Sequence, residues 1–319
     1  MTRYIVQRLL ALLPVVLVVS IVIFSITYLT PGDPARNILG PDASQAQVDA
    51  LRDSLGLNAP LVTQYFSWLG GVLTGDLGES FFMRKPVLTA IADNFLPTLQ
   101  LATIAIAVAL GVAIPFGTLA ARYRGSGLDQ TVTVATLLSM AVPSFVLGLL
   151  LMVVFAVNLR WFPVAGYVNP FTDFGAGIKT LILPGVALGT IVAALITRTT
   201  RAAVLDVLNS GYIDAARSRG VSNLRLLFAH TLKNAGLPVL TNVGLVVGSL
   251  VTGAAVTETI FNIPGLGSLL VQAITRRDYT IIQGVVLAIT LCYLLVNLII
   301  DLLYGLVDPR VRLGRKSGE

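Results

Sequence analysis

Long apolar stretches alternate with shorter polar stretches along the whole chain. Six apolar runs each approach the roughly 20 residues that an α-helix needs to cross a bilayer. They cover about residues 9–30, 97–121, 130–156, 178–198, 237–257 and 281–307. This pattern predicts an all-α integral membrane protein with six transmembrane helices.

The polar stretches divide the chain into unequal parts. We expect an amino-terminal tail with the first span at 1–30, an outer connection at 31–96, a core of five helices at 97–307 and a tail at 308–319. Within the outer connection, 44–55 has a helical pattern that starts near Ser44. A second amphipathic piece, 61–73, is expected to lie against the outer membrane surface or to cover the spans.

The composition supports a membrane protein and the charges set its orientation. Only 12% of the residues are charged, against about 25% in soluble domains. Lys and Arg gather on one side of the predicted spans, at Arg3, Arg8, Arg122, Arg124, Arg198, Arg201, Arg217, Arg219, Arg225, Lys233, Arg310, Arg312, Arg315 and Lys316. Cytosolic loops carry such an excess, so both termini and the connection at 199–236 are expected in the cytosol. The net charge of +6 is therefore a topology signal and gives no reason to expect a nucleic-acid partner.

Few residues offer chemistry of their own. Cys292 is the single cysteine and His230 the single histidine, so a disulfide within the chain or a cysteine-based metal site is excluded. The nearest approach to an ATP-binding P-loop, Gly177-Ile178-Lys179-Thr180, lacks a glycine before the lysine and falls on the outer side. We therefore expect no catalytic site, no metal and no cofactor on this chain.

The most informative stretch is the basic, amphipathic run from Tyr212 to Lys233. Ala216 and Gly220 are four residues apart, so a helix would place both on one face, where another backbone or side chain comes close. Gly220 suits a left-handed helix stop, and Ser222 suits the cap of a second helix. The run predicts a helix–turn–helix unit held at the membrane surface.

This run resembles the coupling loop of ABC importer permeases, in which Glu-Ala-Ala is followed, after three residues, by Gly. Asp214 stands at the acidic position, and the spacing to Gly220 is kept. The sequence departs from the general pattern at Lys233, where a proline is usual, although Pro238 follows. Further motifs in the same order are Pro31–Ala35, Leu55–Leu57, Gly75–Gly78, Pro143–Phe145, Trp161–Pro163 and Ile263–Gly267. Together they are similar to a permease subunit of dipeptide/oligopeptide importers, a branch that also includes nickel and glutathione permeases.

The resemblance implies a fold, a location and partners. It implies a type I ABC importer permease fold with a cytoplasmic coupling helix, in a bacterial or archaeal cell membrane. The implied partners are a second homologous permease subunit, an extracytoplasmic substrate-binding protein, and two cytosolic ATPase subunits or one fused pair that hold ATP and Mg²⁺. The implied ATPase-coupling residues are Tyr212, Asp214, Ala215, Ala216, Arg217, Arg219 and Gly220. The motifs do not separate peptide import from nickel or glutathione import.

Polar residues near or within the spans are further candidates. Glu258, at the outer end of the fifth span, and the turn formed by Pro264, Gly265 and Gly267 are candidates for an outer gate or a binding-protein contact. For Glu258 the alternative is simple exposure at the interface.

Three more polar residues are candidates for the translocation path: Asn242, Thr252 and Asp301. The first two would otherwise bond between helices, and Asp301 would otherwise pair with Arg310 or Arg312. The glycine pairs Gly185/Gly189 and Gly244/Gly248 have a spacing that lets membrane helices approach closely, within this chain or between two permease subunits.

Two other classes of protein compete with an ABC permease. An ion-coupled secondary transporter would need several acids in mid-span, and only Asp301 is close to that position. A membrane-anchored DNA-binding regulator would use the basic loop on nucleic acid and bind in a salt-dependent manner.

Overall fold

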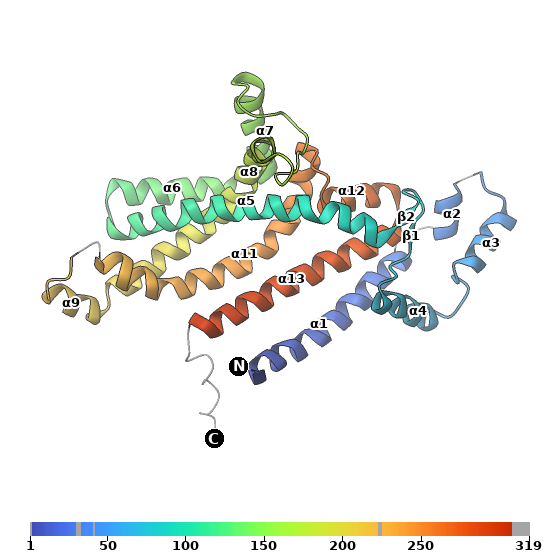
Figure 1. Ribbon diagram of the computed structural model, residues 1–319, viewed down its shortest axis with the longest axis horizontal. Helices are drawn as coiled ribbons and strands as arrows, with labels where there is room; N and C mark the ends of the chain where they lie inside the picture. Colours follow the sequence, from blue (N-terminus) through green and yellow to red (C-terminus); the bar gives the residue numbers. More distant parts are fainter. Residues whose placement is uncertain (1, 30–32, 41, 223–224, 308–319) are drawn as a thin grey trace.

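The computed structural model describes residues 2–29, 33–40, 42–222 and 225–307, excluding the side chains of 2–9, 26–27, 29, 37, 247–249, 251–252, 301 and 303–307. Helices dominate this part of the chain (Figure 1). The elements are α1 (Thr2–Leu29), α2 (Pro34–Leu39), α3 (Gln45–Ser54), α4 (Leu61–Thr74), β1 (Glu79–Ser80), β2 (Lys85–Pro86), α5 (Val87–Arg122), α6 (Gly127–Ala141), α7 (Ser144–Leu151), η1 (Met152–Asn158), α8 (Phe174–Leu208), α9 (Gly211–Ser218), η2 (Leu226–Thr231), α11 (Leu232–Phe261), α12 (Leu266–Arg276) and α13 (Tyr279–Val307). Both η elements are π-helices.

Several helices are long and apolar enough to cross a membrane. Within the described ranges these are α5, α8 and the Tyr279–Ile300 part of α13. Two bent pairs raise the number to five, namely α6 with Ser144–Asn158 and Gly253–Phe261 with α12. Helix α1 adds a shorter apolar stretch, Leu10–Ser25. The chain is thus an all-helical membrane protein with three to five candidate spans, and six spans stays a prediction.

The span expected over 130–156 is not one straight helix. It bends by 101° between α6 and the segment that begins at Ser144. Val142 is extended, with φ −91° and ψ 121°, immediately before Pro143. Proline has no N–H and disfavours the helical conformation of the residue before it, so α6 ends there. The prediction of a continuous span is wrong at this dipeptide.

Helices α5 and α8 form the most closely packed pair of the bundle. Leu101, Ala105, Ala109 and Ala113, which are four residues apart along α5, are fully buried. A Cβ added to Gly189 of α8 would lie 2.6 Å from the carbonyl oxygen of Ala105, so the two backbones are in contact there. Small residues at such an interface let membrane helices approach closely. The Gly185/Gly189 pair therefore packs two helices of this chain.

The second glycine pair is only partly described. Gly244 of α11 faces Ile300 of α13, whose side-chain atoms would lie 3.0 Å from an added Cβ. The surroundings of Gly248 lie outside the described set.

The elements gather at two opposite ends of the molecule (Figure 1). Helix α9 and the turn between α5 and α6 lie toward one end, on the left of the figure. Helices α2 to α4, the two strands and α12 lie toward the other end. The assignment of one of these ends to the cytosol and of the other to the outer side, made from the distribution of Lys and Arg, stays a prediction.

Both helices predicted in the outer connection are present. Ser44 caps α3 through a reciprocal pair of bonds with Gln47, the capping box of a helix start. Helix α4 ends at Gly75, whose φ of 83° is in the left-handed region that glycine adopts without strain. Tyr65 of α4 bonds the hydroxyl of Ser20 at 2.8 Å. Helix α4 therefore covers part of α1, as expected.

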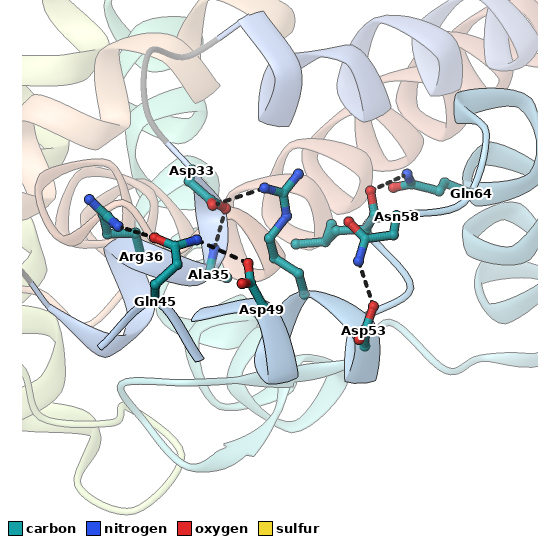
Figure 2. Close-up of polar contacts among 10 residues, drawn as sticks. Asp33, Ala35, Arg36, Gln45, Asp49, Asp53, Asn58 and Gln64 are labelled. Atoms are coloured by element: carbon teal, nitrogen blue, oxygen red, sulfur yellow. Dashed lines mark hydrogen bonds and ion pairs between the residues drawn. The ribbon is translucent and has the colours of Figure 1, made fainter. Parts of the chain in front are cut away.

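Polar contacts connect α2 with α3 (Figure 2). Asp33 caps α2 by accepting the N–H of Ala35 and also pairs with Arg52 of α3 at 3.5 Å. Arg36 donates to Gln45 at 2.7 Å. These bonds hold α2 against α3.

The sequence analysis missed the antiparallel pair β1–β2 and helix α12. The strands pair Glu79 with Pro86 and Ser80 with Lys85. The Ser80 hydroxyl donates to Asp278 at 2.6 Å, and Asp278 also accepts the N–H of Ile281 in the first turn of α13. A buried acid therefore fastens the strands to the outer end of α13.

Candidate functional site

Helix α9 is a short helix at the end opposite to the strands. It follows the long helix α8 after only Asn209 and Ser210. It ends in a Schellman motif, in which the N–H of Gly220 bonds the carbonyl of Arg217 and the N–H of Val221 bonds that of Ala216. Gly220 has φ 78°, so the predicted left-handed helix stop is confirmed. The carbonyl of Ser222 accepts the N–H of Leu226 at 2.9 Å at the start of the next helical segment.

The packing of α9 corrects one expectation about its faces. The helix ends at Ser218, so Ala216 and Gly220 do not share a helical face. Ala216 is 5% exposed and packs with Ile213 and Leu226 of the same chain. The sequence pattern identified a close approach correctly but not its partner, because the neighbours of Ala216 come from this chain.

The remaining coupling candidates form an exposed surface, which we call the α9 outer face. Its members are Tyr212, Asp214, Ala215, Arg217, Arg219 and Gly220. Asp214 and Arg217 are 3.4 Å apart with most of both side chains in solvent, so their ion pair contributes little to stability. Nothing lies within 4 Å of a Cβ added to Gly220. Among the residues that the structure describes, the face is therefore open to solvent apart from the Tyr212 hydroxyl, which bonds to Asn234.

The α9 outer face is attached firmly to the bundle. The Tyr212 hydroxyl accepts a bond from Asn234 of α11 at 2.8 Å. Beneath the helix, Val207 and Leu208 at the end of α8 pack against Ile213 and its neighbours. Helix α9 is therefore in contact with both α8 and α11.

A second ionic contact near this end was missed by the sequence analysis. Arg201 of α8 donates two hydrogen bonds to Asp129 of α6, from Nε to Oδ1 at 2.6 Å and from Nη2 to Oδ2 at 2.8 Å. Asp129 also accepts the N–H of Gly125 at 3.0 Å. In the sequence, the one feature that pointed to this contact was the position of Asp129 in the first turn of a helix that Ser126 caps.

Glu258 lies at the opposite end and is fully buried, so the alternative of exposure at the interface is wrong for this structure, whereas a contact with a binding protein stays a prediction. Its carboxylate accepts the Thr98 hydroxyl at 2.6 Å and the Ser268 N–H at 2.9 Å. Gly265 and Gly267 of the turn lie directly against this site. A Cβ on Gly265 would fall 2.2 Å from the Glu258 carboxyl carbon, and one on Gly267 would fall 2.4 Å from Cα of Ala255. Both glycines are thus required for close packing.

The candidates for the translocation path are placed only in part. Asn242 of α11 donates to Thr199 of α8 at 2.7 Å and to the carbonyl of Leu195 at 3.3 Å. It therefore bonds between helices, which was one of the two alternatives. Thr252 and Asp301 lie in α11 and α13, but their side chains fall outside the described set.

The left-handed residue at the end of α9 gives a first test. Because Gly220 has open space around it, only its backbone conformation restricts a substitution. We expect Gly220→Val to destabilise the end of α9 by about 1–2 kcal/mol, whereas Gly220→Asn is tolerated better because Asn visits the left-handed region. Limited proteolysis of inside-out vesicles near residues 211–225 measures this. Equal cleavage rates for both variants would contradict the assignment.

The chain has apolar helices long enough to cross a membrane, the short charged helix α9 at one end and the bonded turn at Glu258 at the other. These features define a helical membrane transport component. Comparison with known families makes this specific. The model of the "Binding-protein-dependent transport system inner membrane component" matches residues 113–313, and the corresponding amino-terminal model matches residues 1–102. The chain belongs to this family. It is accordingly an inner-membrane transport subunit and not an enzyme.

Individual relatives cover nearly the whole chain. The probable peptide ABC transporter permease protein y4tP of Sinorhizobium fredii is 41% identical over 97% of this chain and 99% of the relative. The glutathione transport system permease protein GsiC of Escherichia coli O6:H1 is 38% identical over 98% of this chain and 99% of the relative. Among solved structures, the MetNI methionine ABC transporter in inward-facing conformations is similar in fold. It has a TM-score of 0.58 at 18% identity and covers 69% of this chain and 97% of that chain.

Proposed function

We propose that this chain is a permease subunit of an ATP-driven importer that translocates short peptides delivered by an extracytoplasmic binding protein. The full-length similarity to a peptide permease and to a glutathione permease carries the proposal, because glutathione is itself a small peptide. The family is dependent on binding proteins, which implies such a protein and ATPase subunits as partners. This favours the ABC class over an ion-coupled transporter and over a DNA-binding regulator.

The proposal assigns a role to each part of the chain. Residues 97–307 form the permease core of a six-span, type I importer, with cytosolic tails at 1–8 and 308–319. The connection at 31–96 lies outside. A second, homologous permease subunit completes the pathway, and ATP and Mg²⁺ are bound by the ATPase subunits, with no cofactor on this chain.

The α9 outer face is the docking surface for an ATPase subunit in this proposal. Three observations support it: the face is exposed, it carries Asp214, Arg217 and Arg219, and it is fixed to α8 and α11. Closing of the ATPases on ATP would move α9, and α9 would move the helices that it contacts. Ala216 belongs to the inner face and supports the position of α9 instead of touching the ATPase.

A charge reversal tests the docking role. In proteoliposomes that contain the assembled importer, we expect the Arg217→Glu/Arg219→Glu double variant to lower ATP-driven uptake of a radiolabelled tripeptide by at least about tenfold. A loss of about 1.4 kcal/mol of docking free energy suffices for this. The matched control, Arg160→Glu/Lys179→Glu, reverses two exposed charges before and near the beginning of α8, away from α9, and should retain uptake. Equal uptake by both double variants would refute docking at α9.

The energy source of uptake tests separately whether the chain belongs to an ATP-driven importer. The unmodified complex should import the tripeptide only with ATP and binding protein present. Uptake that is driven by an ion gradient without ATP would instead support a secondary transporter.

A further inference from the structure

Helix α12 begins in an unusual way, since side chains of other helices hold its first N–H groups. The N–H of Leu266 donates to the Thr98 hydroxyl at 2.8 Å. The N–H groups of Gly267 and Ser268 donate to the Glu258 carboxylate, the latter at 2.9 Å. Three donors that a helix start leaves free are thus bound by side chains of α5 and α11.

Thr98 and Glu258 are also bonded to each other. The Thr98 hydroxyl donates to Glu258 at 2.6 Å while it accepts from Leu266, although 160 residues separate Thr98 from Glu258. None of the bonds described for this carboxylate comes from a positively charged side chain. A carboxylate in such a buried place is stabilised only while its hydrogen-bond donors stay in position. The favourable charge of a helix N-terminus adds to their effect.

Because these bonds share the same groups, we expect α12 either to occupy this position with all of them formed or to leave it with all of them broken. If α12 moves away, the carboxylate loses two backbone donors and the Thr98 hydroxyl loses the N–H of Leu266. Below the bonded end, Leu269 and Ala273 of α12 pack against Val87 and Ala90 of α5 and against Ile281 of α13. The bonds at the start of α12 and the packing along it therefore form or break together.

We propose that Glu258 and Thr98 are positioning residues that seat α12 against the outer ends of α5 and α13, and that this seated helix is the outer closure of the transport pathway. Between α11 and α12 the chain turns by 86°, so α12 does not continue the α11 span. Release of the seat opens the outer side, and its restoration closes it. The gate role rests on the proposed transport function, whereas the seating itself does not.

Cysteine accessibility tests the seating directly. In a Cys292→Ser background, Ala273→Cys places a thiol on the packed side of α12, where Ala273 is 4% exposed, and Thr275→Cys places one on its exposed side. A membrane-impermeant maleimide is added from outside to cells that express the full complex. Adding Glu258→Gln or Thr98→Val should raise the labelling rate at position 273 by about tenfold, the effect of losing roughly one charge-assisted hydrogen bond. Labelling at position 275 should not change.

Two matched controls separate positioning from general disturbance. Thr98→Ser keeps the hydroxyl and should restore slow labelling at position 273. Asp93→Asn removes an exposed carboxylate from the same helix, α5, and should leave labelling slow. Fast labelling with Thr98→Ser, or slow labelling with both Thr98→Val and Glu258→Gln, would overturn the inference whatever happens to transport.

ATP hydrolysis by the reconstituted complex tests the gate role. With Glu258→Gln we expect hydrolysis without binding protein to rise by about tenfold, because the outer side opens without the signal that normally opens it. Raised labelling at position 273 together with hydrolysis that still depends fully on the binding protein would overturn the gate role. If the unmodified complex imports no peptide, the proposed function fails, but the labelling result still decides whether α12 is seated by Glu258.

Discussion

Replacing Gly189 by leucine is expected to prevent the chain from accumulating as a folded protein in the membrane. A Cβ at this position already lies 2.6 Å from the carbonyl oxygen of Ala105 and 3.3 Å from its Cα. Backbone atoms cannot swing aside, so α5 and α8 must separate along their tightest contact. Overpacking of a core costs about 1–3 kcal/mol, and more where a whole side chain has no space. Such a loss is a large part of the roughly 5–15 kcal/mol by which proteins are stable.

The test compares two glycines within membrane helices. Gly111 of α5 is exposed and has nothing within 4 Å of an added Cβ. Gly111→Leu should therefore accumulate normally and keep its melting temperature in detergent, while Gly189→Leu should be nearly absent from the membrane fraction. Gly189→Ala should fall between them. Equal amounts of the two leucine variants would show that the helices are not in backbone contact.

Features with a strong local signal were predicted well from the sequence. The lengths of the apolar runs anticipated α1, α5, α8, α11 and α13 to within some ten residues. Ser44 and Gln47 mark the start of α3 through a pattern that requires only neighbouring residues. Gly220 marked the end of α9 for the same reason. In each case the residues that cause the feature are adjacent in the chain.

Features that depend on distant residues were missed. Helix α12 begins among turn residues, and the groups that hold its first turn are Thr98 and Glu258. The break before Pro143 lies within an apolar stretch that continues on both sides, so hydropathy alone does not reveal it. The small residue Ala216 signalled a close contact, but a pattern of small residues does not identify the neighbour.

The missed contacts also show how the two ends of the molecule are connected. Helix α8 runs without interruption from Phe174 to Leu208 and packs along α5, while α5 carries Thr98 of the α12 seat at its outer part. At the other end, α8 leads into α9 and binds α6 through Arg201. In the proposed importer, α8 with α5 is therefore the rigid body that joins the ATPase side to the outer closure.

Breaking the Asp129–Arg201 pair is expected to destabilise the packing of α6 against α8 near α9. The Asp129 side chain is 8% exposed and that of Arg201 31% exposed. Removal of one partner from a buried ion pair costs about 3–5 kcal/mol, because the other charge stays buried without compensation. Since Arg201 keeps some contact with solvent, we expect about 2–3 kcal/mol for Asp129→Asn, measured as the loss of thermal stability of the purified chain in detergent.

The exposed pair Asp214–Arg217 provides the matched control for this change. Asp214→Asn also removes one carboxylate from an ion pair with arginine, but both side chains are mostly in solvent, and no measurable change in stability is expected. A double-mutant cycle with Arg201→Met should give a coupling energy of about 2 kcal/mol, since each single change breaks the same contact. If Asp129→Asn and Asp214→Asn were equally stable, Arg201 would not be holding α6 against α8. The path from α9 into the bundle would then run through α11 and the Tyr212–Asn234 bond instead.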